Sequence, residues 1–373
     1  MFDRRPSLRG AIIGYGFISE RGHAPAYKAL ARKGEAPLEI VAVVDTCAAR
    51  RERARAELPG VRIYESADAL FAIEGGTLDF VDISAPPSEH APLALRALDR
   101  GLHVLCEKPL ATTPEAARAM LARARRVGRV LYPCHNYRHA PVIKAVRRAL
   151  DADRIGRVTM VTLQTFRSTH ARGVPEFRPD WRREKRWSGG GIAMDHGSHT
   201  FYLAFDWLGA YPTAITAKMS TLGRYDTEDN LSCAISFPGA TASAHLSWTA
   251  GVRKVIYTLH GERGAIRVED DDVEVNVLTS RDGEPHKWQT LRDSVPSNWM
   301  DASHVTWFES MLTDFAHAVE IDEHVGKSAE DSLRCVELIT RAYQSAIEGS
   351  RELPLGEAAR LRRARRPAVS VAR

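Results

Sequence analysis

The sequence has few cysteines and no long hydrophobic run, and each shortage excludes a class of protein. The five cysteines are scattered and form no C-x-x-C pair, which argues against a zinc site and a disulfide framework. The longest apolar runs, such as Leu38–Val44, fall far short of the ~20 residues that a membrane span needs. No apolar segment follows the charged start Met1–Gly10, so we predict no signal peptide, no membrane association and a cytoplasmic protein.

Charge is nearly balanced, with 52 Lys and Arg against 47 Asp and Glu. The basic excess lies at the C-terminus, because Arg360–Arg373 contains six arginines and no acid. Such a tail is compatible with nucleic acid or acidic lipid, but a solvated, frayed terminus is the favoured interpretation. The sequence contains no RNP motif, zinc finger or strongly basic recognition helix, so we expect no nucleic-acid partner.

The overall composition is that of a globular protein, with 44% apolar and 27% charged residues. These proportions argue against a disordered chain, a collagen-like repeat and a coiled coil. At ~150 residues per domain, a chain of 373 residues is expected to hold two or three domains.

The first 150 residues alternate short apolar runs with helix-length segments. The predicted strands, nearly continuous in apolarity as strands buried on both faces are, comprise Leu8–Ile13, Leu38–Val44, Arg62–Tyr64, Asp79–Ser84, His103–Cys106 and Arg129–Cys134. The predicted helices between them include Ala24–Lys33, Ala48–Leu58, Glu89–Arg100 and Pro114–Val127, the last preceded by the N-cap residue Thr113. This alternation predicts a doubly wound parallel sheet, a Rossmann domain, over residues 1–138.

Beyond Gly156 the pattern changes to strands of alternating polarity. They are predicted at Arg157–Phe166, Thr213–Thr221, Leu231–Phe237, Ala240–Trp248, Val255–His260 and Ala265–Glu269, with closing helices near Ser303–Glu320 and Ala329–Glu348. We predict an α+β domain over residues 139–355, built on a large, mostly antiparallel sheet, and a basic tail over 356–373. Because an open sheet face must be covered, we expect a homodimer or homotetramer through this sheet.

The first predicted strand runs into a glycine turn of the form G-x-G-x-x-S. Gly14 permits the tight turn, Gly16 lets the backbone approach a pyrophosphate, and Ser19 is small enough for the third position. Amide groups at the start of the next helix would face the phosphates. Asp45, at the end of the second predicted strand, suits the adenosine ribose diol and would repel a 2′-phosphate. The pattern predicts a dinucleotide, with NAD favoured.

Two alternatives stay open around this acid. Arg50 and Arg51 lie within reach of a 2′-phosphate, which keeps NADP possible. Asp45 could also serve as a helix cap rather than as a ribose ligand.

Lysine is scarce, and one of the nine lies where the fifth predicted strand ends. Ligands bind outside the carboxyl ends of parallel strands, so Lys108 is expected in the same crevice as the glycine turn. There its ammonium can donate to a substrate oxygen and stabilise a developing alkoxide. A surface charge before a turn is the alternative interpretation.

A run of three glycines, Gly189–Gly191, precedes a predicted helix that continues to Leu208. Asp195 and His199 are spaced i, i+4, so they would share one face of that helix. An imidazole oriented by a carboxylate suits proton transfer near neutral pH. His196 and His199 are spaced i, i+3, but two histidines and one acid make a weak zinc pattern, so no metal is predicted.

Together these motifs resemble the Gfo/Idh/MocA oxidoreductases, which include glucose–fructose oxidoreductase and inositol dehydrogenase. The resemblance spans about residues 8–350 and is carried by the G-x-G turn, the triplet Glu107-Lys108-Pro109 and the pattern G-G-G-x-x-x-D-x-G-x-H. It implies that the catalytic residues are Lys108, Asp195 and His199. It implies cofactor contacts at Gly14, Gly16, Phe17, Ile18, Asp45, Ala85, Pro86, His90, Glu107, Lys108, Asn136, Trp181 and Arg182. It implies substrate contacts at Lys108, Tyr137, Arg138, Asp195, His196 and His199.

The resemblance also implies a reaction, hydride transfer between NAD, or NADP, and a secondary alcohol of a sugar, cyclitol or sugar derivative. His199 would take the hydroxyl proton, Lys108 would stabilise charge on the oxygen, and Asp195 would orient these groups or the substrate. One alternative is a redox-neutral enzyme in which NAD oxidises a sugar transiently to enable elimination, glycoside cleavage or epimerisation. Another is a non-catalytic sensor of cofactor or sugar, which would not need all three residues.

The segment Arg167–Trp187 is unusually basic, with seven basic side chains, three acidic ones and two tryptophans. One interpretation is a lid whose aromatic faces and arginine donors contact the substrate. The other is a solvated connection or a subunit contact. The segment alone therefore does not establish an acidic substrate.

Overall fold

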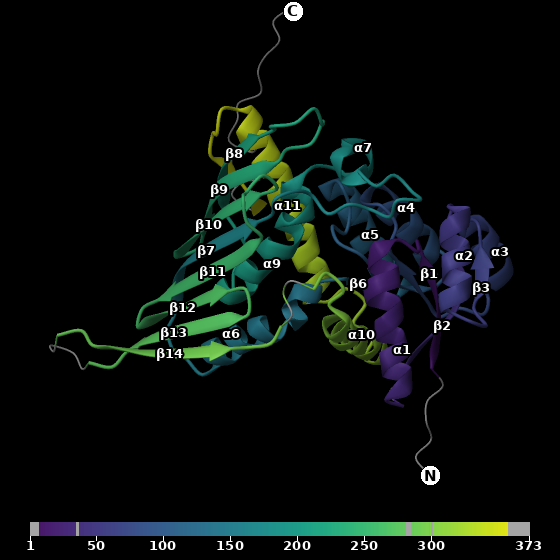
Figure 1. The fold of residues 1–373 in the computed structure, drawn as a ribbon, viewed down its shortest axis with the longest axis horizontal. Helices are drawn as coiled ribbons and strands as arrows, with labels where there is room; N and C mark the ends of the chain where they lie inside the picture. The colour runs from purple at the N-terminus through teal and green to yellow at the C-terminus, as the bar shows by residue number, and fades with distance from the viewer. Residues whose placement is uncertain (1–6, 35–36, 281–284, 298, 300, 357–373) are drawn as a thin grey trace, which may run out of the picture.

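The computed structural model describes residues 7–34, 37–280, 285–297, 299 and 301–356. Two sheets organise this part of the chain, with helices packed between them (Figure 1). The predicted basic tail lies outside the described residues, apart from Gly356. None of the described helices combines the length and the apolar character that crossing a membrane requires.

The N-terminal sheet has six parallel strands in the order β3-β2-β1-β4-β5-β6, which confirms the predicted doubly wound fold. The strands are β1 (Leu8–Ile13), β2 (Leu38–Val44), β3 (Arg62–Tyr64), β4 (Phe80–Ile83), β5 (His103–Cys106) and β6 (Leu131–Pro133). β4 and β5 are buried at every position, as their continuous apolarity predicts. The order reverses between β1 and β4, where such sheets open a ligand crevice.

Helices cover both faces of this sheet. They are the π-helical turn η1 (Ser19–His23), α1 (Ala24–Arg32), α2 (Ala48–Glu57), α3 (Ala67–Glu74), α4 (Pro87–Leu98) and α5 (Pro114–Val127). The predicted cap of α5 is confirmed, because the Thr113 hydroxyl accepts the N–H of Ala116 at 3.2 Å.

The second sheet has nine strands in the order β14-β13-β12-β11-β7-β10-β9-β8-β15. They are β7 (Val158–Phe166), β8 (Ala214–Ser220), β9 (Asn230–Phe237), β10 (Ala240–Ser247), β11 (Lys254–Gly261), β12 (Gly264–Glu269), β13 (Asp272–Leu278), β14 (Trp288–Ser294) and β15 (Leu353–Pro354). Only the β7–β10 pair among them is parallel, so the predicted, mostly antiparallel sheet is confirmed. The sequence prediction missed β13 and β14, which extend from the body as an arm (Figure 1). β14 is exposed at every position and so lacks the alternating burial that identifies a strand.

Helices lie on the face of the second sheet that turns toward the first (Figure 1). α6 (Pro141–Asp151), α9 (Gly197–Leu208) and α11 (Lys327–Ile347) pack against its strands. The other helical elements of this part of the chain are η2 (Asn136–His139), η3 (Trp181–Arg183), α7 (Lys185–Ser188), α8 (Ile192–Asp195) and α10 (Val305–Glu320). α9 is buried on nearly all sides, which fits its almost continuous apolar sequence.

α10 belongs to the predicted second domain by its residue numbers but packs against the first sheet. Phe308 and Phe315 of α10 pack into a buried cluster with Ile12 and Phe80 of the first sheet. The rings of Phe80 and Phe315 meet edge to face, with centroids 5.4 Å apart. A division between residues 138 and 139 therefore separates the two sheets but not the helices that cover them.

Candidate active site

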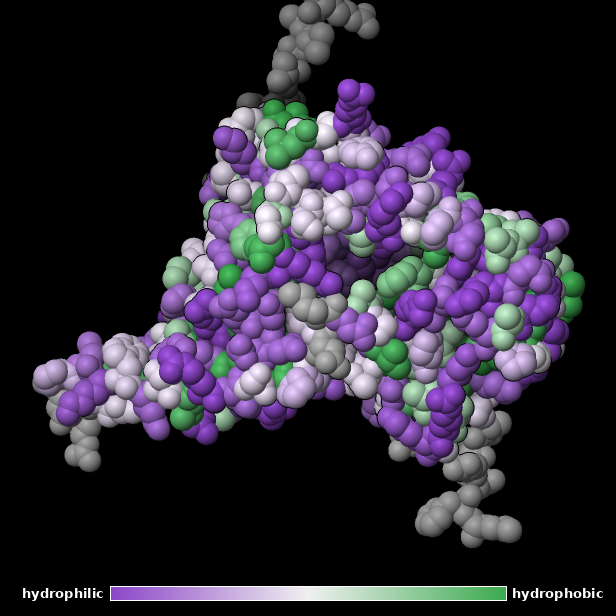
Figure 2. Space-filling model, viewed as in Figure 1, coloured by the Kyte–Doolittle hydropathy of each residue, from purple (hydrophilic) through white to green (hydrophobic). Residues whose placement is uncertain are grey.

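Two adjoining cavities lie between the sheets. A cavity of about 410 Å³ is lined by the glycine turn and Asp45, and one of about 200 Å³ by Lys108, Asp195 and His199. The residues that line both are Phe17, Ile18, Ser84, Ala85, Trp181 and Arg182. The molecular surface is hollowed between the two parts of the molecule (Figure 2). The lysine and the histidine that sequence reasoning singled out therefore lie in one cavity.

The glycine turn is shaped for a close ligand approach. Gly14 has φ of 98°, and a Cβ there would lie 2.8 Å from the carbonyl oxygen of Ser84. A Cβ on Gly16 would meet nothing within 4 Å, so the backbone lies open on that side. The hydroxyl of Ser19 donates to the Gly14 carbonyl at 2.5 Å, which stabilises the turn without a third glycine. This cradle fits a bound pyrophosphate.

Asp45 lies in the larger cavity and retains acceptor capacity for a ligand. Its Oδ2 accepts the N–H of Tyr15 at 2.7 Å, and its Oδ1 accepts the N–H of Cys47 at 2.8 Å. A carboxylate has about four acceptor positions, so two remain for a ribose diol. The N-cap residue of α2 is Cys47, and no side chain caps that helix.

The two arginines that kept NADP open are both engaged within the protein. Arg50 donates to the carbonyl of Tyr15 at 2.8 Å and pairs with the buried carboxylate of Glu20. Arg51 donates to the main-chain carbonyls of Asp45 and Thr46. An available carboxylate beside occupied guanidiniums fits NAD better than a cofactor with a 2′-phosphate.

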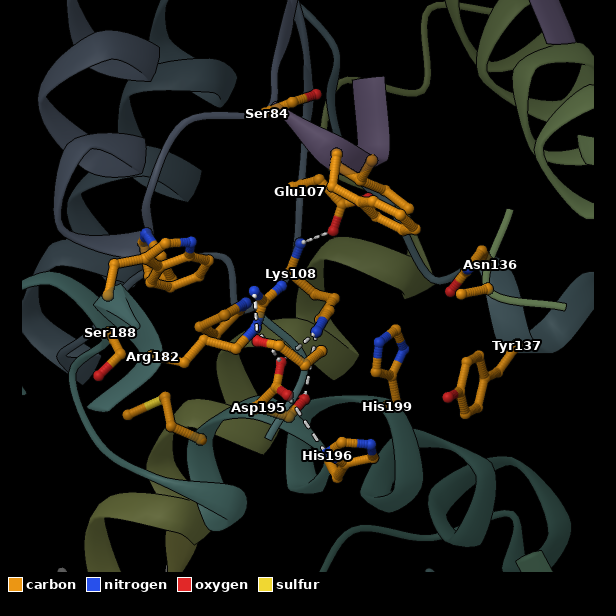
Figure 3. A pocket seen from close by; sticks show the side chains of 18 of the residues that line it. Ser84, Glu107, Lys108, Asn136, Tyr137, Arg182, Ser188, Asp195, His196 and His199 are labelled. Carbon is orange, nitrogen blue, oxygen red and sulfur yellow. Dashed lines mark hydrogen bonds and ion pairs between the residues drawn. The ribbon is translucent and has the colours of Figure 1, made fainter. Parts of the chain in front are cut away.

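An ion pair brings the end of the first sheet to the helices of the second (Figure 3). Nζ of Lys108, just after β5, lies 2.8 Å from Oδ1 of Asp195, the last residue of α8. Nε of Arg182 lies 3.7 Å from the same oxygen. Burial alone would raise the pKa of Asp195, but Lys108, Arg182 and His196 hold it well below its usual range. The carboxylate is therefore anionic and holds the ammonium in the cavity.

His199 lies beside this pair (Figure 3). Its ring stacks on that of Tyr137, with centroids 4.1 Å apart, and its Nδ1 is buried with no hydrogen-bond partner among the described residues. Burial, followed by the charge of Lys108, holds the pKa of His199 well below its usual value. The ring is therefore a neutral imidazole that can accept a proton.

The prediction of one continuous helix through Asp195 and His199 is wrong. α8 ends at Asp195 and α9 begins at Gly197, so the helix is interrupted at His196. The Asp195 carbonyl accepts the Ser198 hydroxyl and the Lys108 ammonium, while the N–H of His199 donates to the His196 carbonyl at 3.1 Å rather than to Asp195.

A carboxylate from the loop before β9, distant in the sequence, holds the short helix α8. Both oxygens of the Glu228 carboxylate accept main-chain N–H groups, those of Gly191 and Ala193, each at 2.9 Å. A Cβ on Gly191 would lie 1.9 Å from the Glu228 carbonyl oxygen, which explains one glycine of the run of three. Sequence reasoning missed Glu228, because nothing local links it to the glycine run.

Most of the other expected site residues line a cavity, and two do not. Those that line one are Gly14, Gly16, Phe17, Ile18, Ala85, Pro86, Glu107, Asn136, Tyr137, Trp181, Arg182 and His196. His90 instead lies behind the cavities, with its ring nitrogens 2.8 and 2.7 Å from the carbonyl oxygens of Ala85 and Pro109. Arg138 pairs with the buried carboxylate of Asp331 in α11 and lines neither cavity. His90 can position the loops, but neither side chain is placed for direct ligand contact.

The basic segment 167–187 lies over both cavities. Trp181 and Arg182 line the two, Gly173 and Trp187 line the larger one, and Arg167 lines the smaller one. The guanidinium of Arg182 stacks over the Trp181 ring, 4.2 Å from its centroid. The segment is therefore placed as a cover over the cavities.

A buried charged cluster next to Lys108 was also missed from the sequence. Nδ1 of His23 lies 2.7 Å from Oδ2 of Asp82, and Nε2 lies 3.2 Å from Oε1 of Glu107. Glu107 also accepts the main-chain N–H of Lys108 at 3.0 Å. Burial alone would lower the pKa of His23, but Asp82 and Glu107 raise it to about 10. Asp82, an acid within the apolar strand β4, was the available signal, because a buried acid needs a partner.

This cluster also contains the one group with metal-binding geometry found among the described residues. Ligand atoms of His23, Glu107 and Cys134 lie within 4.8 Å of one another. Both nitrogens of His23 already contact carboxylates, so the cluster is satisfied without an ion.

Two family models match consecutive parts of the chain. Residues 8–135 match the oxidoreductase family with an NAD-binding Rossmann fold, and residues 143–267 match the GFO/IDH/MocA C-terminal domain. The chain belongs to the Gfo/Idh/MocA family. It is an NAD-binding oxidoreductase, and its glycine turn and Asp45 have the residue chemistry that this cofactor needs.

Other members of the Gfo/Idh/MocA family match over most of their length. The inositol 2-dehydrogenase of Rhizobium meliloti is 29% identical over 357 residues, which cover 92% of this chain and 98% of that protein. The 1,5-anhydro-D-fructose reductase of Ensifer adhaerens is 29% identical over 300 residues, which cover 79% of this chain and 85% of that protein. The solved structure of GenD2 from gentamicin A biosynthesis, in complex with NAD, has a TM-score of 0.78 at 25% identity and covers 95% of this chain and 98% of that chain. The solved structure of levoglucosan dehydrogenase with NADH shares the fold, with a TM-score of 0.80 at 23% identity. The match covers 94% of this chain and 100% of that chain.

Proposed function

We propose that the protein oxidises or reduces a secondary alcohol of a sugar, cyclitol or sugar derivative with NAD. One observation carries this proposal: the ammonium of Lys108 and the neutral imidazole of His199 line a single cavity that adjoins the dinucleotide cavity. A hydroxyl placed between these two groups would meet one donor and one proton acceptor.

The proposed roles follow from the charge states of the three side chains. Lys108 donates a hydrogen bond to the alcohol oxygen and stabilises negative charge on it. His199, held neutral, takes the hydroxyl proton during oxidation and returns it during reduction. Asp195 remains anionic and positions the ammonium. When bound, NAD supplies the hydride acceptor, and the side chains supply orientation, charge stabilisation and the proton path.

The substrate class is supported by the relatives and by the cavity lining. Curated relatives named inositol 2-dehydrogenase, D-apiose dehydrogenase and D-glucoside 3-dehydrogenase match this chain at 29–31% identity. The smaller cavity combines the aromatic faces of Tyr137 and Trp181 with polar groups. Aromatic faces against ring carbons and polar groups against hydroxyls suit a polyol.

A panel of polyols, sugars and glycosides assayed with NAD and NADP tests the proposal. Lys108→Ala should lower kcat by roughly 100-fold, because a preorganised donor to the reacting oxygen is lost. Lys287→Ala, on the exposed arm, is the matched control. Near-wild-type turnover by Lys108→Ala with bound cofactor would contradict the assignment.

The same assay separates net oxidation from the redox-neutral alternative. Net oxidation accumulates NADH in proportion to product, whereas a redox-neutral cycle converts the sugar without accumulating NADH. Product mass measured beside NADH absorbance therefore distinguishes the two reactions. Substrate binding without turnover of any kind would instead favour a sensor.

The organisation of the chain is part of the proposal. We assign residues 1–138 to cofactor binding and 139–355 to substrate binding and assembly, with α10 packed back onto the first sheet. Among the described residues, no helix lies on the outer face of the second sheet (Figure 1). We propose a homodimer or homotetramer through this face, and a light-scattering mass equal to one 41.4 kDa chain would refute it.

A further inference from the structure

The substrate cavity has a cationic end that the proposed reaction does not use. Arg167 follows β7, Arg253 precedes β11, and both side chains line the cavity that contains Lys108 and His199. Arg167 is partly buried and Arg253 lies exposed at the rim.

Strand register places the two arginines together. Phe166 of β7 pairs with Lys254 of antiparallel β11. The next residue of one strand, Arg167, and the preceding residue of the other, Arg253, therefore lie beyond the same end of the pair. The main chain of Arg167 is held by Ser247 and Ala250, at 2.8 and 3.0 Å. Its guanidinium donates to the Phe166 carbonyl at 2.8 Å, which leaves further N–H donors free.

The other charged groups of this cavity have partners of opposite charge. Asp195 pairs with Lys108 and lies 3.7 Å from Arg182, while Glu107 pairs with His23. In the part of the chain that the structure describes, neither Arg167 nor Arg253 forms an ion pair with a carboxylate.

The titratable groups nearest to this end of the cavity are engaged elsewhere in the protein or are neutral. Asp270 and Asp301 both attract the Arg253 guanidinium, but Asp270 pairs with Lys254 at 3.2 Å, and Asp301 accepts the N–H and hydroxyl of Ser303, at 2.9 and 2.8 Å. Burial and then the like charge of Arg167 lower the pKa of Arg253. His304 also lines the cavity, and burial lowers its pKa to about 4, so it is neutral. The two neighbouring guanidiniums thus repel each other, and neither is ion-paired with a carboxylate of the described residues.

The cofactor does not account for these arginines. The larger cavity, which contains the glycine turn and Asp45, is lined by neither of them. The pyrophosphate of a dinucleotide belongs at that turn. An anion at Arg167 and Arg253 must therefore come from the molecule in the smaller cavity.

We infer that the substrate carries an oxyanion, a carboxylate or a phosphate monoester, which Arg167 and Arg253 bind while Lys108 and His199 act on its hydroxyl. Guanidinium forks match both oxyanions in geometry and charge. This inference rests on the proposed function and narrows its substrate class from sugars in general to sugar acids or sugar phosphates.

Matched pairs of neutral and anionic sugars test the inference. Glucose is compared with D-glucuronate and D-glucose 6-phosphate, and galactose with D-galacturonate, in turnover and in thermal stabilisation of the NADH complex. The wild-type enzyme should prefer an anionic member at least about tenfold in kcat/KM, or be stabilised by it and not by its neutral partner. Comparing the two sugar carboxylates with the sugar phosphate shows which of the two oxyanions the arginines bind.

Variants assign the preference to the two side chains. Arg167→Gln and Arg253→Gln should each lower kcat/KM for the anionic sugar about tenfold or more, and change that for the neutral partner less than about threefold. Arg55→Gln, on the exposed face of α2, is the control and should change neither value. Higher salt should weaken binding of the anionic sugar in the wild type and less so in the two variants.

Two results would overturn the inference. One is a neutral sugar preferred over its anionic partner, and the other is no stabilisation by any of the three anions. Either leaves the proposed dehydrogenase reaction intact, since that depends on Lys108 and His199. If an anionic sugar binds through the arginines but Lys108→Ala keeps full turnover, the proposed chemistry fails and the oxyanion site stands.

Discussion

Charged side chains beside the first sheet are paired within the protein, whereas two arginines at one end of the substrate cavity are not. Beside the first sheet, His23 of η1 lies between two carboxylates, and Arg50 of α2 pairs with Glu20. In the substrate cavity Arg167 and Arg253 form no ion pair within the described residues. A buried polar group without a partner costs about 1–3 kcal/mol, so a stable fold tolerates few of them. Arginines that line a cavity without a carboxylate partner are therefore candidates for ligand contact.

The contrast separates groups that maintain the fold from groups that perform the reaction. Replacing a side chain whose charge is paired within the protein should change stability more than turnover. Replacing a side chain whose charge or ring nitrogen faces the ligand should change turnover more than stability. Three substitutions test this division, beginning with the largest expected effect.

Replacement of His199 should produce the largest loss of activity. His199→Gln removes the proton acceptor, and we expect kcat to fall by about 10²–10⁴-fold with little change in the free energy of unfolding. Because the pKa of His199 lies well below its usual value, wild-type kcat/KM for oxidation should not fall through protonation of this ring between pH 8 and about 6.5. Steady-state kinetics across this range measure both effects, with His317→Gln at an exposed position of α10 as the control. Full activity in His199→Gln would remove this residue from the mechanism.

Replacement of His23 should affect stability most. His23→Leu leaves Asp82 and Glu107 buried without their cationic partner, which should lower the free energy of unfolding by about 3 kcal/mol in urea denaturation. The double variant His23→Leu/Asp82→Asn should lose less than the sum of the two single changes, because one uncompensated charge is removed with its partner. Additive losses would show that the cluster is not electrostatically coupled.

The same cluster predicts a pH dependence of wild-type stability. The pKa of His23 is about 10 in the folded protein, above the ordinary value of 6.5. Its contribution is therefore complete below about pH 6.5 and is lost as the pH rises toward 10. His23→Leu should lack this loss at alkaline pH.

Much of the fold follows from local sequence patterns. Continuous apolar runs identified β1, β2 and β5 to the residue, and Thr113 before Pro114 identified the start of α5. The rule that ligands bind at the carboxyl ends of parallel strands placed Lys108 in the crevice. Each of these inferences needs only a short window or a general property of the sheet.

The features that were missed depend on contacts between distant segments. The register of β7 against β11 brings Arg167 and Arg253 together, and no local pattern encodes that register. At the interruption near His196, the Asp195 carbonyl accepts the ammonium of the distant Lys108 and the Ser198 hydroxyl, while the His199 N–H donates to His196. His90 and Arg138 were assigned to ligands from the family resemblance, but nearby carbonyls and Asp331 contact them instead. Spacing identifies the residue types of a site, and tertiary packing decides which of them face the ligand.

Asp45 offers the smallest of the three effects and the sharpest test of the comparison, because it both holds the turn and faces the larger cavity. Asp45→Asn keeps one oxygen acceptor and loses the charge, so NADH should bind roughly tenfold more weakly by calorimetry, while NADPH loses less or gains. Asp68→Asn, at an exposed position of α3, is the control for loss of an acid alone. If Asp45→Asn unfolds more readily yet binds both cofactors as the wild type does, then Asp45 serves only the turn, and the division between structural and ligand-binding charges fails at this residue.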